Sequence, residues 1–169
     1  MNGIIAAAFW TSAFLNPVSP LFDGIRDRQA TADSSVQMSA VYFQREIIGE
    51  ELGVSVTSDI AYGPLQPIFA GSVTETGSLW VGYGFLNEIP FLDGLSIKLT
   101  FIPGVYSKGN GEDLGGWLMF RSGVNLVYNF SGKYSLGLGY DHRSSGDIWD
   151  YNPGMETVNL QLSIRNKQW

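Results

Sequence analysis

The chain has 169 residues, a length that suits one domain. Charged residues make up only 15% of it, whereas ordinary soluble domains have roughly 25%, and glycine and aromatic residues are abundant. A formal net charge of -6 without a run of Lys or Arg argues against a nucleic-acid partner, and the absence of cysteine excludes disulfides, thiolate catalysis and cysteine-based zinc sites.

Residues 1–32 are expected to form an apolar leader or tether ahead of the main domain. The run 4–15 resembles the hydrophobic region of a signal peptide in length, and Ala30-Thr31-Ala32 resembles a small-residue cleavage site. However, no Lys or Arg precedes the apolar run, and charged residues separate it from Ala32. Two interpretations therefore stay open: a cleaved leader, or a segment that packs on the fold.

From Ser35 onward, apolar and polar residues alternate with a period of two, which predicts β-strands separated by turns rich in Gly, Pro and Asn. Eight strands are predicted, at residues 35–44, 53–62, 67–74, 78–86, 95–106, 116–130, 133–144 and 156–165. We expect residues 33–169 to form an all-β domain, an eight-stranded antiparallel up-and-down transmembrane β-barrel. Both termini should lie at one rim, and the connections at the other, namely 45–52, 75–77, 107–115 and 145–155.

The two faces of the strands indicate a membrane setting. In the strand predicted at 95–106, the apolar residues Leu95, Ile97, Leu99 and Phe101 alternate with Ser96, Lys98 and Thr100. The polar face is small and sparsely charged, as a narrow lumen requires, whereas a soluble barrel would display more Lys and Glu. Periodicity alone does not distinguish inside from outside, so a soluble lipid-binding barrel is an alternative.

The last predicted hairpin carries a polar cluster on its apolar face. His142, the only histidine of the chain, lies opposite Glu156 in one antiparallel register, and Ser144 shares the face of His142 because it is two residues away. The same register pairs the apolar residues of the two strands, Tyr140 with Val158, Leu138 with Leu160, Leu136 with Leu162 and Tyr134 with Ile164. The cluster therefore offers a nucleophile, a base and an orienting acid.

The segment from about Gly137 to Ile164 resembles the lipid A 3-O-deacylase (PagL) family, outer-membrane acyl ester hydrolases with a His-x-Ser-Asn motif and a downstream Glu. The matching residues are His142, Ser144, Asn152, Gly154 and Glu156. The resemblance implies that Glu156 orients His142, and that His142 takes the proton of Ser144 as the hydroxyl attacks an acyl ester. It also implies that the site lies on the outer wall of the barrel, where the enzyme meets its lipid substrate laterally.

One residue departs from the family motif. Ser145 stands where the family has Asn, a residue thought to help bind the oxyanion. We expect backbone amides near Ser145 and Gly146 to bind the oxyanion instead, with the Ser145 hydroxyl as a further donor, and we count Asn152 with these substrate-binding residues.

The prediction is thus a serine esterase of the cell outer membrane that removes an ester-linked acyl chain from lipid A of lipopolysaccharide, with no metal and no cofactor. Its expected partners are lipopolysaccharide and outer-membrane lipids, and the chain could form a homodimer. The alternative function is a non-enzymatic barrel that serves as a structural component of an envelope or particle surface.

Overall fold

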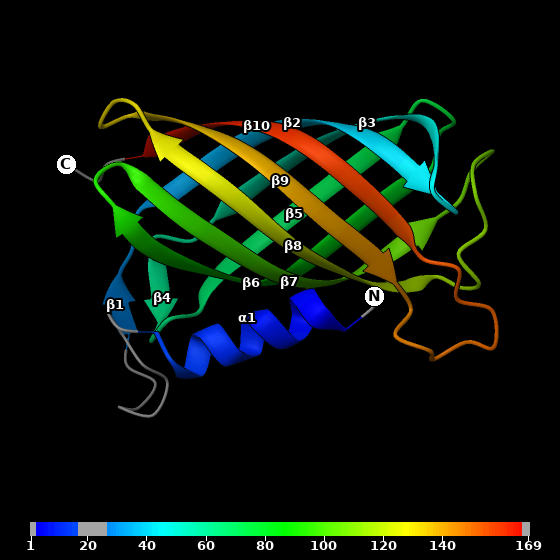
Figure 1. Ribbon diagram of the computed structural model, residues 1–169, viewed down its shortest axis with the longest axis horizontal. Helices are drawn as coiled ribbons and strands as arrows, with labels where there is room; N and C mark the ends of the chain where they lie inside the picture. Colours follow the sequence, from blue (N-terminus) through cyan, green and yellow to red (C-terminus); the bar gives the residue numbers. More distant parts are fainter. Residues whose placement is uncertain (1–2, 17–26, 167–169) are drawn as a thin grey trace.

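The computed structural model describes residues 3–16 and 27–166. Within them, eight strands form a closed antiparallel barrel in the order β10-β2-β3-β5-β6-β7-β8-β9 (Figure 1). The bounds are β2 Ala32–Phe43, β3 Glu46–Thr57, β5 Gln66–Thr74, β6 Leu79–Leu92, β7 Leu95–Ser107, β8 Leu118–Asn129, β9 Tyr134–Ser144 and β10 Met155–Asn166. Because β10 pairs with β2, the barrel has no free edge, and the predicted fold class is confirmed.

One rim, here called the loop rim, carries the connections 44–45, 75–78, 108–117 and 145–154. The predicted loop at 45–52 is wrong, because β3 already begins at Glu46. Gln44 and Arg45 form a two-residue hairpin turn with φ angles of 50° and 74°, the left-handed conformation that such turns require. A register shift between Val41 and Tyr42 interrupts the period of two at this point, which hid the start of β3 from the sequence pattern.

Two further boundaries differ from the prediction at the opposite rim. Strand β6 continues to Leu92, so the predicted connection after residue 86 shrinks to Asp93 and Gly94. The strand predicted at 53–62 is split, because β3 ends at Thr57 and Ile60–Tyr62 forms a separate strand, β4. Strand β4 pairs with β1 (Asp27–Gln29) in a small sheet outside the barrel.

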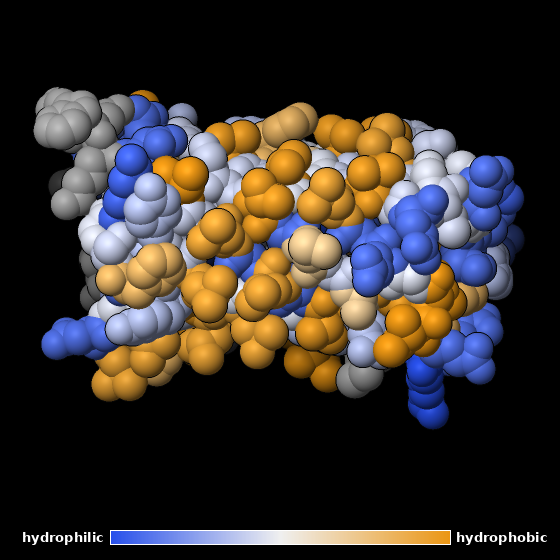
Figure 2. Space-filling view, turned by 90° about the horizontal axis from the view of Figure 1, so that it is seen from above, coloured by the Kyte–Doolittle hydropathy of each residue, from blue (hydrophilic) through white to orange (hydrophobic). Residues whose placement is uncertain are grey.

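Apolar side chains point outward from the barrel wall. On the face seen in Figure 2 they form a band across the middle of the barrel, with hydrophilic residues gathered toward both ends. Large exposed residues of this band include Met38, Val54, Phe69, Leu126, Leu138 and Leu160. The soluble-barrel alternative is therefore wrong, because its apolar stripes would have to line the interior.

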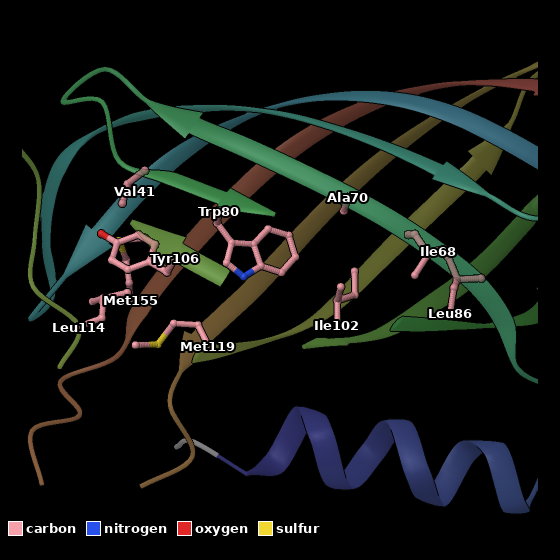
Figure 3. Packing of buried hydrophobic residues seen from close by; sticks show 10 residues of the cluster. All are labelled: Val41, Ile68, Ala70, Trp80, Leu86, Ile102, Tyr106, Leu114, Met119 and Met155. Atoms are coloured by element: carbon pink, nitrogen blue, oxygen red, sulfur yellow. The ribbon is translucent and has the colours of Figure 1, made fainter. Parts of the chain in front are cut away.

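The lumen is filled by charged and polar side chains that pair with one another. Glu51 lies 3.1 Å from Arg121 and 2.8 Å from Arg143, and Arg121 also lies 3.0 Å from Asp141. Both guanidinium groups sit 5.3 Å from the ring centroid of Trp80. Figure 3 shows the buried apolar cluster around this indole, which includes Val41, Tyr106, Met119 and Met155. This packing fixes the loop-rim ends of the strands that carry the polar cluster.

The N-terminal helix α1 (Ile4–Phe14) lies outside the barrel, against β6, β7 and β8 (Figure 1). It runs back along the wall (Figure 1), so its first turn lies toward the loop rim, whereas the barrel itself begins and ends at the opposite rim as predicted, where Ala32 pairs with Asn166. Among the described residues, α-helical segments with the length and hydropathy of a transmembrane span are absent. Residues 1–2 and 17–26 of the expected leader lie outside the described residues, and the leader or tether role of 1–32 stays a prediction.

Candidate active site

The hairpin of β9 and β10 has the register predicted from its apolar stripes. His142 lies opposite Glu156, Tyr140 opposite Val158 and Leu138 opposite Leu160. In β9, Leu136 and Leu138 are exposed on the outer wall, and His142 and Ser144 follow them on the same parity. The polar cluster therefore lies on the outer wall, at the loop rim.

His142 and Glu156 are joined by a hydrogen bond of 3.3 Å between Nδ1 of the imidazole and Oε1 of the carboxylate. The His142 side chain is almost completely buried, whereas the Glu156 side chain is 26% exposed. With Nδ1–H donating to Glu156, the other ring nitrogen, Nε2, is left as an acceptor. Nε2 is buried and has no hydrogen-bond partner among the described residues. The histidine thus presents an unoccupied basic atom.

Ser144 is the last residue of β9 and lies opposite Phe120 of β8, while His142 lies opposite Ser122. Its side chain is nearly buried, and no hydrogen bond joins it to His142 among the described residues. The structure thus places the expected nucleophile on the same face as the expected base, without a hydrogen bond between them. Phe120 and Ser122 were not identified from the sequence as neighbours of the site, because cross-strand pairing with β8 depends on the barrel register.

Gly154, just before β10, packs against the imidazole of His142. A Cβ atom at Gly154 would lie 2.9 Å from Cε1 of His142, and the residue has a φ angle of 71°. Both features favour glycine at this position, one for space and the other for backbone conformation. Gly154 therefore sets how closely the loop approaches the base.

Asn152 makes two hydrogen bonds within the loop 145–154. These bonds differ from the expected oxyanion arrangement. The backbone N–H of Ser145 donates to Oδ1 of Asn152 at 2.9 Å, and Nδ2 of Asn152 donates to Oδ1 of Asp147 at 2.8 Å. In this conformation the Asn152 carbonyl already accepts the hydrogen bond of the Ser145 amide, and the role of this amide in binding the oxyanion stays a prediction. The substrate-binding role of Asn152 stays a prediction.

Two other donors expected in the oxyanion site have no hydrogen-bond partner among the described residues. The Ser145 hydroxyl is fully buried and unpaired. The Gly146 amide makes no hydrogen bond to the described residues, and Gly146 has a φ angle of 64°. Gly146 and the Ser145 hydroxyl are thus the donors that remain beside Ser144.

The sequence model of the family described as lipid A 3-O-deacylase (PagL) matches residues 54–165, which contain the whole polar cluster. The chain belongs to the lipid A 3-O-deacylase (PagL) family. Helix α1 lies outside the matched residues. No curated protein sequence matches the chain.

Solved structures give the same fold. The crystal structure of the outer membrane enzyme PagL is 19% identical, with a TM-score of 0.63 over 78% of this chain and 98% of that one. A de novo designed transmembrane β-barrel is 10% identical, with a TM-score of 0.57 over 85% and 100% of the two chains. The N-terminal barrel of Pseudomonas aeruginosa OprF is 11% identical, with a TM-score of 0.56 over 82% and 98%. This PagL-family chain is an outer-membrane β-barrel.

Proposed function

We propose that this PagL-family protein is a serine esterase that removes an ester-linked acyl chain from lipid A, at the 3-O position that the family description names. The hydrogen bond between His142 and Glu156, with Ser144 on the same face, is the observation that carries the proposal. Family membership supports lipid A as the substrate.

The proposed reaction uses each residue in one role. Glu156 accepts the Nδ1 proton in a hydrogen bond and stabilises the imidazolium that forms. When the Ser144 side chain turns toward His142, Nε2 takes the hydroxyl proton as the oxygen attacks the ester carbonyl. Catalytic hydrogen bonds are commonly long without substrate, so the absent contact in the free protein fits this role. His142 then protonates the leaving sugar oxygen, and water releases the fatty acid from Ser144.

The oxyanion of the tetrahedral intermediate needs hydrogen-bond donors that have no other partner. The Gly146 amide and the Ser145 hydroxyl fit this need, because neither has a hydrogen-bond partner among the described residues. The Ser145 amide fits it only if Asn152 releases it. We therefore assign the oxyanion to Gly146 first and to the Ser145 hydroxyl second.

The position of the site on the wall supports a lateral approach by the substrate. Ser144 lies at the end of β9, next to the rim that carries the longer connections, 108–117 and 145–154. In outer-membrane barrels the longer loops face the exterior, where the outer leaflet holds lipid A. An ester near the headgroup level could reach Ser144 without entering the lumen, which is filled by paired charges.

The experiment is an assay of the refolded protein in detergent micelles with purified lipopolysaccharide, followed by mass spectrometry of lipid A. The wild type should release one 3-O-linked acyl chain, and Ser144→Ala should release none while keeping its barrel circular dichroism. Ser135→Ala is the matched control, because Ser135 lies in the same strand but is buried in the lumen. A wild-type protein that leaves lipid A unchanged would favour the structural-component function.

A further inference from the structure

An asparagine on the outer wall binds helix α1 to the barrel. Asn87 lies opposite Leu99 in the β6 and β7 pair and is completely buried. Its Nδ2 donates to the Ser12 hydroxyl at 2.8 Å, and its Oδ1 accepts from Nδ2 of Asn16 at 2.8 Å. An asparagine on a lipid-facing wall is costly unless both ends of its amide are hydrogen-bonded. The two polar residues of the α1 segment supply both of these partners.

Aromatic side chains extend this contact toward the polar cluster. Phe9 is fully buried, and its ring centroid lies 6.1 Å from that of Phe101, while Trp10 lies 6.0 Å from Phe101. Phe101 stacks on Phe120 at 5.8 Å, and Phe120 is the residue opposite Ser144. A continuous aromatic series therefore links α1 to the expected nucleophile.

The opposite side of α1 is suited to hydrocarbon. Ile4 and Phe14 are 69% and 39% exposed, and Trp10, at the edge of the contact with Phe101, is 40% exposed, so α1 also presents apolar side chains that the barrel does not cover. A helix that is apolar all round is stable only when buried in protein or lipid. With 11 residues, α1 is too short to span a bilayer, and it lies along the outer wall against β6, β7 and β8.

The slant of the strands places α1 on the path of a substrate chain. Acyl chains run along the bilayer normal, which is the long axis of the barrel. Figure 1 shows that a line drawn along this axis from the end of β9 crosses β8 and then β7, beside α1. The outer residues in this region include Ser122, which pairs with both His142 and Phe101. Ser122 is the smallest outward-facing residue of β8, and it is itself buried between these two residues.

We propose that α1 is a permanent part of the outer wall, and that Trp10, supported by the buried ring of Phe9, borders the path of the acyl chain whose ester lies at Ser144. This proposal rests on the function proposed above. It assigns chain-length selection to a helix outside the family match. The aromatic series forms one wall of the path, and Trp10 contacts the chain below the level of the ester.

Photolabelling tests this path without any need for turnover. Lipid A with a diazirine at the end of its 3-O acyl chain is irradiated with the Ser144→Ala protein, and the labelled peptides are identified by mass spectrometry. The label should lie in residues 4–14 and in β8. Label confined to the other flank of the site, in β2 or β10, would overturn the proposal. Label on α1 with a wild type that cleaves nothing would instead overturn only the esterase function.

Chain-length selection gives a second readout. Synthetic esters of graded acyl length are compared for the wild type, Trp10→Ala and the control Phe14→Ala, which removes an equally exposed aromatic residue one turn farther along α1. Each methylene that loses apolar contact should lower the relative rate about fourfold. Trp10→Ala should therefore lose its preference for the longer esters while Phe14→Ala keeps it. Identical profiles for all three proteins would contradict the proposal.

Engineered cysteines test the permanence of α1, because the natural chain has none. Ser12→Cys with Asn87→Cys should form a disulfide in the outer-membrane protein, and the locked protein should keep the wild-type chain-length profile. The mass of the extracted wild-type protein should include residues 4–14. If the extracted protein lacks this segment, α1 is not a fixed wall. The same conclusion follows if the disulfide abolishes hydrolysis and its reduction restores it.

Discussion

Gly154 and the imidazole of His142 are in contact at the edge of the site. A methyl group at Gly154 would lie 2.9 Å from Cε1 and 3.6 Å from Nε2 of His142. Nε2 is also the atom that the proposed reaction needs as a base. The backbone of one residue thus limits the position of the ring that activates Ser144.

We expect Gly154→Ala to lower the rate of lipid A deacylation at least about tenfold, because the added methyl displaces the imidazole from its position beside Glu156. The left-handed φ of 71° adds a strain of about 1–2 kcal/mol. Mass spectrometry of lipid A gives the rate. Gly77→Ala is a control for backbone strain, since its φ is 80° and nothing lies within 4 Å of a Cβ there. Equal activity of wild type and Gly154→Ala would mean that the contact between Gly154 and His142 does not limit the position of the imidazole.

Glu156→Gln should lower the deacylation rate by about 10²–10⁴-fold, because the amide does not stabilise the imidazolium of His142. The barrel should fold normally, since the Glu156 side chain is partly exposed on the outer wall. Single-turnover kinetics with lipid A in micelles measures the effect. A rate within twofold of the wild type would remove Glu156 from the reaction.

Ser145→Ala separates the two remaining oxyanion donors. The Ser145 hydroxyl is buried without a partner, so its removal should leave the stability unchanged or slightly higher. If the hydroxyl binds the oxyanion, the rate should fall, by up to about 10²-fold. Thermal unfolding and the lipid A assay are measured on the same sample. An unchanged rate would assign the oxyanion to the Gly146 amide alone.

Glu51→Ala should destabilise the barrel by about 3–5 kcal/mol, because it leaves the buried guanidinium of Arg143 without a carboxylate and weakens the pairing of Arg121. The free energy of unfolding is measured in urea, with the folded fraction read from the heat-dependent mobility shift of the barrel on gels. Asp113→Ala is the control, since Asp113 pairs with Lys108 on an exposed loop, and it should change stability little. Comparable stability for both variants would mean that the lumen network does not support the fold.

Leu126→Arg should make the free energy of membrane insertion less favourable by roughly 2–4 kcal/mol, because Leu126 is an exposed residue of the apolar band on β8. Asn125→Ala, which changes the neighbouring lumen-facing residue, should be milder. Folding yields into bilayers of defined thickness distinguish the two. Equal yields would mean that this part of β8 does not contact lipid.

The alternation of apolar and polar residues was enough to predict the barrel and the hairpin that carries the site. Strand residues alternate between two faces, so the pairing of Leu138 with Leu160 also fixed the position of His142 opposite Glu156. The shortage of charge on the polar face indicated its inward direction, because a narrow lumen holds few charges and needs them paired. Periodicity failed where a register shift or a tight turn interrupted it, as at Val41 and Glu46, and at the opposite rim, where β3 ends at Thr57 and β6 continues to Leu92.

Contacts between residues far apart in the sequence could be known only from the tertiary structure. The hydrogen bond between Asn16 and Asn87 joins residues 71 positions apart, and that between Arg143 and Glu51 joins residues 92 positions apart. The bond of Asn152 to the Ser145 amide depends on the path of a loop without periodicity. Such contacts follow from how the closed wall brings distant strands together, and α1 could be placed only once that wall offered Asn87 as its partner.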